Sequence, residues 1–227
     1  MQVNVFYETS KIQDEQFNEY ADLIVEWNKK INLTAITNRE DIIIKHFIDS
    51  LSISKYINNN LKVIDIGTGA GFPGIPLKIY NPSLNITLLD SLNKRIKFLD
   101  TVIEELKLNN IRTIHGRAEE IARNNNYREK YDIVTSRAVS KLNTLVEYML
   151  PFAKKNGICI CMKGPNIYEE LDEAKKAIKI LGGKVEKVEE FFLPKTDIKR
   201  TVIIIKKIKN TDEKYPRNAG IPIKKPL

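Results

Sequence analysis

Glycines and acidic residues at short, regular spacing form the part of this sequence best suited to chemistry. The run Asp65-Ile-Gly-Thr-Gly-Ala-Gly-Phe-Pro-Gly74 follows β-branched residues that favour a buried strand, and its glycines end that strand. Glycine permits tight turns and lets the backbone lie close to a ligand. Pro73 and Pro76 are compatible with the first turn of a helix. The pattern therefore predicts a strand, a glycine turn and a helix that together bind a nucleotide.

A second acidic residue, Asp90, ends the next predicted strand, which covers residues 85–90. A carboxylate at that position would lie beside a bound ribose. We expect Asp90 to lie outside the core, so that Asp90→Ala weakens ligand binding and leaves the fold intact. Gly69-Ala-Gly-Phe-Pro-Gly74 matches the G-x-G-x-x-G pattern of dinucleotide-binding proteins, with Asp90 at about the expected distance of ~20 residues. A nicotinamide-dependent oxidoreductase is therefore one interpretation.

A broader pattern favours another ligand. Asp65, the glycines Gly67, Gly69 and Gly71, and Asp90 together resemble motif I and the following acidic residue of the S-adenosylmethionine-dependent methyltransferases. This cofactor has no pyrophosphate, so its turn requires room next to the backbone more than it requires amides facing a phosphate. Its methionine ammonium favours a nearby carboxylate, which Asp65 could supply directly or through a water.

Strands and helices are expected to alternate from about residue 61, which implies a parallel sheet covered on both faces. The expected strands are 61–66, 85–90, 111–115, 130–136, 157–163, 184–192 and 201–207, with helices at 73–81, 92–108, 117–124, 140–154 and 167–181. The last two strands are close in sequence and predict an antiparallel terminal hairpin. The fold class is α/β, Rossmann-like, with a seven-stranded, mostly parallel sheet as in class I methyltransferases. Helices at 13–31 and 40–56 predict an N-terminal helical extension over 1–60, before the cofactor-binding domain 61–207 and a basic tail 208–227.

Composition and charge restrict the class of protein. The 227 residues are 42% hydrophobic and 29% charged, which is ordinary for a globular chain. The N-terminus lacks the pattern of a signal peptide, and we expect a cytoplasmic location. Cys159 and Cys161 alternate on a predicted strand and are expected to pack in the core, with no metal site. The net charge is +8, and most of it lies between Lys195 and Leu227, which suggests a polyanionic partner such as nucleic acid.

Longer segments resemble one family, the bacterial small-subunit ribosomal RNA methyltransferase G family, also called glucose-inhibited division protein B. The resemblance spans nearly the whole chain. Besides the glycine run, the segments that carry it are Trp27-Asn-Lys-Lys-Ile-Asn-Leu-Thr34, His46-Phe-Ile-Asp49-Ser50, Leu88-Leu-Asp90-Ser-Leu-Asn-Lys-Arg95, Gly116-Arg-Ala-Glu-Glu120, Thr135-Ser-Arg137-Ala138, Met162-Lys163-Gly164 and Tyr215-Pro-Arg217-Asn-Ala-Gly220-Ile-Pro-Ile-Lys-Lys-Pro-Leu227.

The resemblance implies an enzyme that methylates N7 of one guanine, guanine-527, in 16S ribosomal RNA. It implies S-adenosylmethionine as the methyl donor, S-adenosylhomocysteine as the product, and cofactor contacts at Gly67, Phe72, the pair Ala118-Glu119, and Arg137. Asp90 is expected at the ribose by analogy with methyltransferases in general. Guanine N7 carries an in-plane lone pair and no proton, so no general base is needed and catalysis rests on alignment.

Several residues are candidates for holding RNA. Lys163 ends a predicted strand and Arg137 directly follows one, so both are expected at the ligand crevice, where they would position the substrate. Phosphate contacts are expected from the C-terminal cations Arg200, Lys206, Lys207, Arg217, Lys224 and Lys225. The expected partner is 16S ribosomal RNA or the small ribosomal subunit, without a membrane, and the protein is expected to be a monomer. A non-catalytic ribosome-assembly module that retains the cofactor fold is a further alternative.

Overall fold

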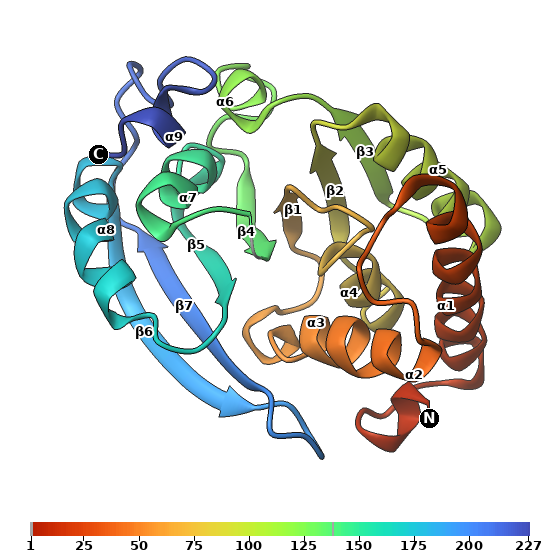
Figure 1. Cartoon of the computed structure of the whole chain (residues 1–227). Helices are drawn as coiled ribbons and strands as arrows, with labels where there is room; N and C mark the ends of the chain where they lie inside the picture. Colours follow the sequence, from red (N-terminus) through yellow and green to blue (C-terminus); the bar gives the residue numbers. More distant parts are fainter. Residues whose placement is uncertain (1, 138) are drawn as a thin grey trace.

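A seven-stranded sheet crosses the centre of the protein in the order β3-β2-β1-β4-β5-β7-β6 (Figure 1). The computed structural model describes residues 2–137 and 139–227, so Ala138 of the family resemblance lies outside the described residues. The strands are β1 (Lys62–Ile66), β2 (Asn85–Asp90), β3 (Ile111–His115), β4 (Tyr131–Arg137), β5 (Ala153–Lys163), β6 (Gly183–Phe192) and β7 (Lys199–Lys207).

The strand pairing confirms the predicted fold class. β1 pairs in parallel with both β2 and β4, and β7 pairs antiparallel with β5 and β6. The chain therefore forms a mostly parallel sheet that closes with an antiparallel hairpin. Because the strand order reverses at β1 and β4, their carboxyl ends flank the crevice in which ligands of such sheets bind.

One predicted helix was wrong at its end. The expected helix 140–154 is α7 (Leu142–Met149), and β5 begins at Ala153, four residues before the expected strand. Pro151 follows the helix and lacks the N–H that a further helical turn would need. The chain then turns, so that Ala153 pairs with Tyr131 of β4.

Helices cover both faces of the sheet, and successive strand residues enter different cores. Val63 of β1 belongs to one apolar cluster with residues of α1, α4 and α5, whereas Ile64 belongs to the other with residues of α7 and α8. Cys159 and Cys161 are both buried in the second cluster, which confirms their predicted core role. The helices are α1 (Lys11–Ile31), α4 (Gly74–Tyr80), α5 (Asn93–Glu105), α6 (Ala118–Ile121), α7, α8 (Tyr168–Ile180) and α9 (Ile221–Lys224).

The second N-terminal helix is not the single α-helix expected over 40–56. It consists of α2 (Arg39–Ile42), a π-helical segment (Ile43–Ile48) and α3 (Asp49–Leu51), followed by a 3₁₀ turn (Ser54–Tyr56). A π-helical turn takes in one more residue than an α-helical turn, and such turns are frequent at functional sites. Apolar periodicity alone does not distinguish the two, because Ile43, Phe47 and Leu51 are buried in either case.

The N-terminal helices share a core with the sheet domain. Phe17 and Ile24 of α1 and Phe47 of the π-helical segment lie in the same apolar cluster as Ile75 of α4 and Phe98 of α5. The division at residues 60 and 207 stays a prediction. Among the described residues, none of the helices combines the length and the apolar character that a membrane span requires.

Asp49 holds the N-terminal helices against two strands. Its side chain is 2% exposed and accepts hydrogen bonds from Arg137 of β4 at 3.3 Å and from Arg200 of β7 at 3.1 and 3.2 Å. Two guanidinium groups therefore depend on one buried carboxylate.

Asp49→Ala should lower the free energy of unfolding by about 3 kcal/mol, because it leaves two partly buried guanidinium groups without their buried partner. Urea denaturation measures this loss. Asp41→Ala is the matched control, since Asp41 forms a half-exposed i,i+4 pair with Lys45 on the same segment, and its loss should stay below about 1 kcal/mol. Equal losses in the two variants would contradict the role given to Asp49.

Candidate functional site

The glycine turn after β1 forms a ligand-facing wall made of backbone. Gly67, Gly69 and Gly71 have φ angles of 67°, 65° and 97°, a region that other residues rarely adopt. A Cβ at Gly67 would lie 2.6 Å from Val139 Cγ2, whereas a Cβ at Gly69 would meet nothing within 4 Å. Gly69 therefore faces open space. Gly71 instead faces the protein, since a Cβ there would lie 2.7 Å from the hydroxyl of Tyr20.

Asp65 lies beneath this turn and organises it. Its Oδ2 accepts hydrogen bonds from the Thr68 hydroxyl at 2.6 Å and from the backbone N–H of Gly74 at 2.9 Å. Its Oδ1 is buried and has no hydrogen-bond partner among the described residues. Burial raises the pKa of Asp65 to about 7, and the two hydrogen bonds oppose that rise.

Asp90 holds the turn from the neighbouring strand. Its Oδ2 accepts from the Gly69 N–H at 2.9 Å and its Oδ1 from the Leu92 N–H at 2.9 Å, while Arg95 reaches Oδ2 at 3.3 Å. Asp90 is only 2% exposed. The expectation that it lies outside the core was wrong, because the carboxylate is needed to satisfy backbone donors. Asp90→Ala would therefore disturb the turn itself.

Phe72, His46 and Arg137 form one side of the site. The His46 ring stacks on Phe72 with 4.4 Å between centroids, and the Arg137 guanidinium lies 4.8 Å from the same ring. Arg137 donates to His46 Nδ1 at 2.9 Å. Since arginine only donates, Nδ1 must accept, and the hydrogen on Nε2 is donated to the Thr34 hydroxyl at 2.9 Å. Burial and the charge of Arg137 lower the pKa of His46 to about 3, so this ring is neutral.

Three adjoining cavities lie at the carboxyl ends of the parallel strands. The central cavity, about 390 Å³, is lined by the glycine turn, Asp90, His46 and Arg137. The second cavity, about 400 Å³, shares His46 and Arg137 with it and continues to Lys163 and Arg200. The two cavities therefore meet across one shared pair of side chains.

The side cavity, about 170 Å³, adjoins the central cavity at residues other than His46 and Arg137. It shares Gly67 and Asp90 with the central cavity and is also lined by Ala118, Glu119 and Tyr148. Glu119 is 5% exposed, and its Oε1 accepts from the Gly220 N–H at 3.1 Å. No hydrogen bond from the described residues reaches its Oε2.

The structure brings most of the predicted cofactor residues together. Gly67, Gly69, Phe72, Asp90, Ala118, Glu119 and Arg137 line the central or side cavity. Asp65 and Gly71 are not among the lining residues, because Asp65 lies beneath the turn and Gly71 faces Tyr20 and Ile75. Sequence reasoning gave no site role to Thr34, Val139, Tyr148 or Ile223, which also line these cavities. Thr34 and Ile223 lie in segments of the family resemblance, but nothing in their residue types indicates a site.

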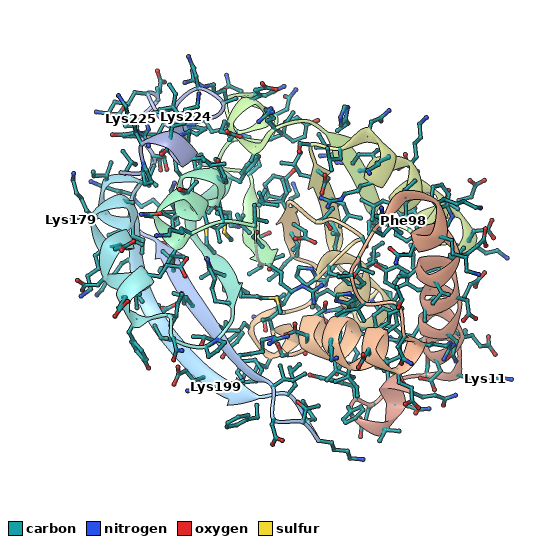
Figure 2. All side chains as sticks on the ribbon, viewed as in Figure 1. Lys11, Phe98, Lys179, Lys199, Lys224 and Lys225 are labelled. Carbon is teal, nitrogen blue, oxygen red and sulfur yellow. The ribbon has the colours of Figure 1, made fainter. Side chains whose placement is uncertain are left out.

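The predicted RNA-contacting cations do not form one patch. Arg200 lines the second cavity, whereas Lys206 lies toward the other end of β7, because it pairs with Ile158 while Thr201 pairs with Lys163. Figure 2 accordingly shows Lys199 and the pair Lys224 and Lys225 on separate sides of the molecule.

Two of these cations are held by the protein itself. The prediction for Lys207 was wrong, because its side chain is 0% exposed and donates to the Leu150 carbonyl at 2.7 Å. The Arg217 side chain binds the buried carboxylate of Glu147, with Nη2 at 2.7 Å from Oε2.

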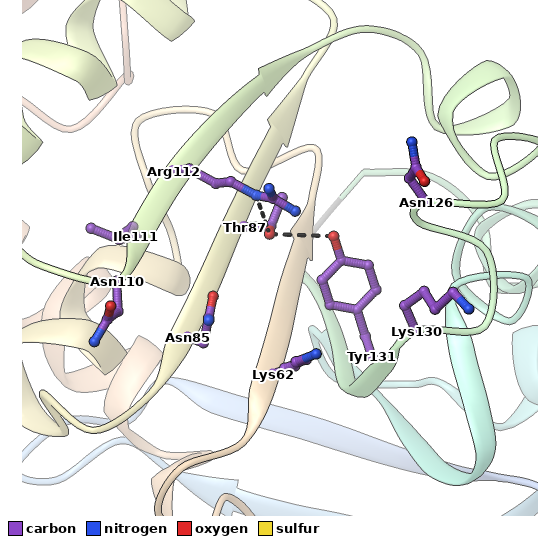
Figure 3. Close-up of a pocket in the computed structure, with 9 residues that line it drawn as sticks. All are labelled: Lys62, Asn85, Thr87, Asn110, Ile111, Arg112, Asn126, Lys130 and Tyr131. Atoms are coloured by element: carbon purple, nitrogen blue, oxygen red, sulfur yellow. Dashed lines mark hydrogen bonds between the residues drawn. The ribbon is translucent and has the colours of Figure 1, made fainter.

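A further cavity, about 450 Å³, lies at the amino ends of the parallel strands, opposite the three cavities described above (Figure 3). Its lining includes Lys62, Asn85, Ile111 and Tyr131, which are the first residues of β1, β2, β3 and β4. Ligands of parallel sheets bind at the carboxyl ends of the strands. This cavity contains none of the predicted cofactor residues and is not assigned to the site.

Comparisons with known proteins agree with the geometry. The family described as rRNA small subunit methyltransferase G matches residues 13–200. The Ribosomal RNA small subunit methyltransferase G of Alkaliphilus oremlandii is 55% identical over 222 residues, covering 96% of this chain and 93% of that protein. The protein of the same name from Acetivibrio thermocellus is 57% identical over 216 residues, covering 95% of this chain and 89% of its own.

Solved structures show the same fold at low sequence identity. A mutant of MtNAS in complex with S-adenosylmethionine has a TM-score of 0.57 at 16% identity, covering 88% of this chain and 73% of its own. The TYW2 protein of M. jannaschii in complex with AdoMet has a TM-score of 0.53 at 17% identity, covering 89% and 78%. Identities this low show the fold alone.

Asp65→Asn should change how stability depends on pH. In the wild type the carboxyl binds a proton more tightly when folded than when unfolded, since its pKa rises from 3.8 to about 7. The free energy of unfolding should therefore fall as pH rises from about 4 to about 7. Between pH 5 and pH 8 the asparagine variant should gain roughly 2–3 kcal/mol relative to the wild type, measured by urea denaturation at both pH values. A constant difference between the two proteins would contradict the raised pKa.

Proposed function

Since the chain belongs to the rRNA small subunit methyltransferase G family, we propose that it transfers the methyl group of S-adenosylmethionine to N7 of a guanine in 16S ribosomal RNA. The target would be guanine-527, as the family resemblance implies. The observation that carries the proposal is the row of three adjoining cavities at the carboxyl ends of the strands. The side and central cavities suit an elongated cofactor, and the second cavity suits a base. The enzyme would act as a cytoplasmic monomer.

The residues around the side and central cavities fit S-adenosylmethionine. The unpartnered Oε2 of Glu119 would accept from the adenine amino group, and Asp90 would accept from the ribose hydroxyls. The open backbone at Gly69 gives room for the rest of the molecule. The Thr34 hydroxyl already accepts from His46 and from the Ile36 N–H, so its own hydrogen is left for a carboxylate in the central cavity.

Asp65 would act on the bound cofactor through its negative charge rather than through a direct hydrogen bond. Its unpartnered Oδ1 is covered by the protein, so it lies below the cavity wall. A cationic ammonium above the turn would favour the ionised carboxylate, which burial otherwise disfavours. This fits a ligand that carries a positive charge better than one that carries a pyrophosphate.

The chemistry requires alignment more than proton transfer. When bound, S-adenosylmethionine supplies a methyl group that is already activated. Guanine N7 carries no proton, so the chain needs no base at that atom. His46 stays neutral, and with Phe72 and Arg137 it lies where the central and second cavities meet. Holding the methyl group and guanine N7 in contact beside these side chains would supply the orientation that the reaction needs.

The second cavity would receive the guanine. Ile36 and Met162 offer apolar contacts for the ring, and the cations around them suit its O6 acceptor, which leaves the N7 lone pair free to react. Lys163 Nζ donates to the Ser140 carbonyl and to Glu170, each at 2.6 Å. An ammonium group has three donors, so one remains for guanine O6 or a nearby phosphate. Because N7 is inaccessible in the narrow major groove of A-form RNA, the target is expected to be unpaired or unstacked.

The exposed lysines at the C-terminus would add phosphate contacts. Lys224 and Lys225 are exposed, and affinity from such contacts falls steeply as salt concentration rises. They carry little sequence information, so recognition of one guanine depends on the second cavity and the N-terminal helices.

Incubation with labelled S-adenosylmethionine and small ribosomal subunits from cells that lack the modification should place label in 16S ribosomal RNA. Chemical cleavage at 7-methylguanosine should then locate one product. Calorimetry with S-adenosylmethionine and with NAD is the control, because the G-x-G-x-x-G match leaves an oxidoreductase as a second candidate. Preferential binding of NAD would overturn the proposal. Normal cofactor binding without labelled RNA would favour the assembly module.

Lys163→Gln should lower kcat/KM for RNA by about tenfold, because it removes the proposed charge-assisted hydrogen bond from Lys163 to guanine O6 or a phosphate. The Kd for S-adenosylmethionine should stay unchanged. Single-turnover methylation and calorimetry measure the two effects. Lys154→Gln is the control, since Lys154 lies at the other end of β5 and pairs with Asp132. An equal effect in both variants, or a loss of cofactor affinity, would contradict the placement of guanine in the second cavity.

A further inference from the structure

The C-terminal segment, residues 208–227, returns across the sheet domain to the side cavity. It begins at the end of β7 and ends in α9, which lies beside α6 and α7 (Figure 1). Ile223 of α9 lines the side cavity together with Glu119, Val139 and Tyr148. The segment is therefore part of a cavity wall as well as a carrier of positive charge.

Several contacts fix the C-terminal segment in this position. Glu147 of α7 is 0% exposed and accepts from the Arg217 backbone N–H at 2.8 Å and from its Nη2 at 2.7 Å. The Thr144 hydroxyl donates to the carbonyl of buried Pro222 at 3.2 Å. Arg128 donates to the Tyr215 carbonyl at 2.8 Å. A flexible RNA-binding arm would not need anchors of this kind.

The C-terminal segment also orients the acidic residue in the cavity. The Gly220 N–H donates to Glu119 Oε1 at 3.1 Å, and no described residue donates to Oε2. Glu119 is 5% exposed, so its second oxygen is available only to a donor that enters the side cavity. An exocyclic amino group is such a donor, and a carbonyl in its place would be repelled.

Two apolar side chains that line the cavity with Glu119 are exposed to solvent. Ile223 is 64% exposed and Val139 is 40% exposed, although both line the cavity. Isolated exposed apolar residues are common, but here two of them border a cavity of about 170 Å³ that contains one buried acceptor. A flat ring with an amino group at its edge matches that combination.

We propose that the C-terminal segment forms the outer wall of the adenine subsite, with Ile223 against the ring and Gly220 holding Glu119 so that Oε2 accepts from the adenine amino group. The inference rests on the proposed function, because it assumes an adenosyl cofactor. It gives the last residues of the chain a role in cofactor binding that is separate from their charge.

Ile223→Ser should raise the Kd for S-adenosylhomocysteine about tenfold in calorimetry, because it removes apolar contact with the ring. Ile221→Ser is the matched control, since Ile221 is 39% exposed on the same helix and does not line the cavity, and its Kd should stay within twofold. Both side chains are exposed, so thermal melting should show both variants folded. Salt-dependent RNA affinity should be unchanged in both.

S-inosylhomocysteine supplies an independent readout, because it carries a carbonyl in place of the amino group. The wild type should bind it at least tenfold more weakly than S-adenosylhomocysteine, and Glu119→Gln should reduce that ratio. Unchanged cofactor affinity in Ile223→Ser would overturn the inference while wild-type binding upholds the cofactor. Weaker RNA binding alone would assign Ile223 to RNA. If the wild type binds neither nucleoside, the proposed function fails together with the inference.

Discussion

Two buried carboxylates hold the glycine-rich turn that follows β1. Asp65 binds the turn from the end of β1, and Asp90 binds it from the end of β2. The pairing of Ile66 with Leu89 fixes the distance between these two strand ends. Without that register Gly67 and Gly69 would lose Leu89 and Asp90 as acceptors for their N–H groups, and the central cavity would lose part of its wall. The cost of burying Asp65 is visible in its raised pKa, and the order of the turn offsets that cost.

The N-terminal helices complete the site because they bring the negative charge of Asp49 to two arginines of the sheet. Asp49 pairs with Arg137 and Arg200, and the π-helical segment before it places His46 between Arg137 and Phe72. The same contacts that attach the helices therefore form the boundary between the central and second cavities. A shift of these helices would change both cavities at once, so the stability of the protein and the proposed alignment of the reactants depend on one set of interactions.

The sequence predicted the sheet well because its strands have strong local patterns. The expected ranges for β2 and β3 match the structure, and the glycine run placed the crevice correctly. The features that the sequence did not predict depend on contacts between segments that are far apart in the chain or on local backbone geometry. Hydrophobic periodicity could not reveal the π-helical turn, and nothing near Lys207 in the sequence indicates that its ammonium is buried. Asp90 was expected to lie outside the core, because its hydrogen bond with the Gly69 N–H depends on a turn geometry that the sequence does not reveal. Ile223 reaches the side cavity only through the path of the whole C-terminal segment.

The same limit applies to charge. The run from Lys195 to Leu227 contains most of the net charge of +8, yet the fold divides it. β7 runs antiparallel to β5, so Arg200 lies near the second cavity while Lys206 lies toward the other end. Arg217 is neutralised by Glu147, and Lys207 is enclosed. A cation contributes to an RNA-binding surface only if its side chain is exposed to solvent and is not held by another group of the protein. Lys224 and Lys225 meet that condition, and Arg200 does so only in part because Asp49 holds it. Part of the positive segment therefore stabilises the fold, and only its exposed cations are left for the proposed contact with RNA.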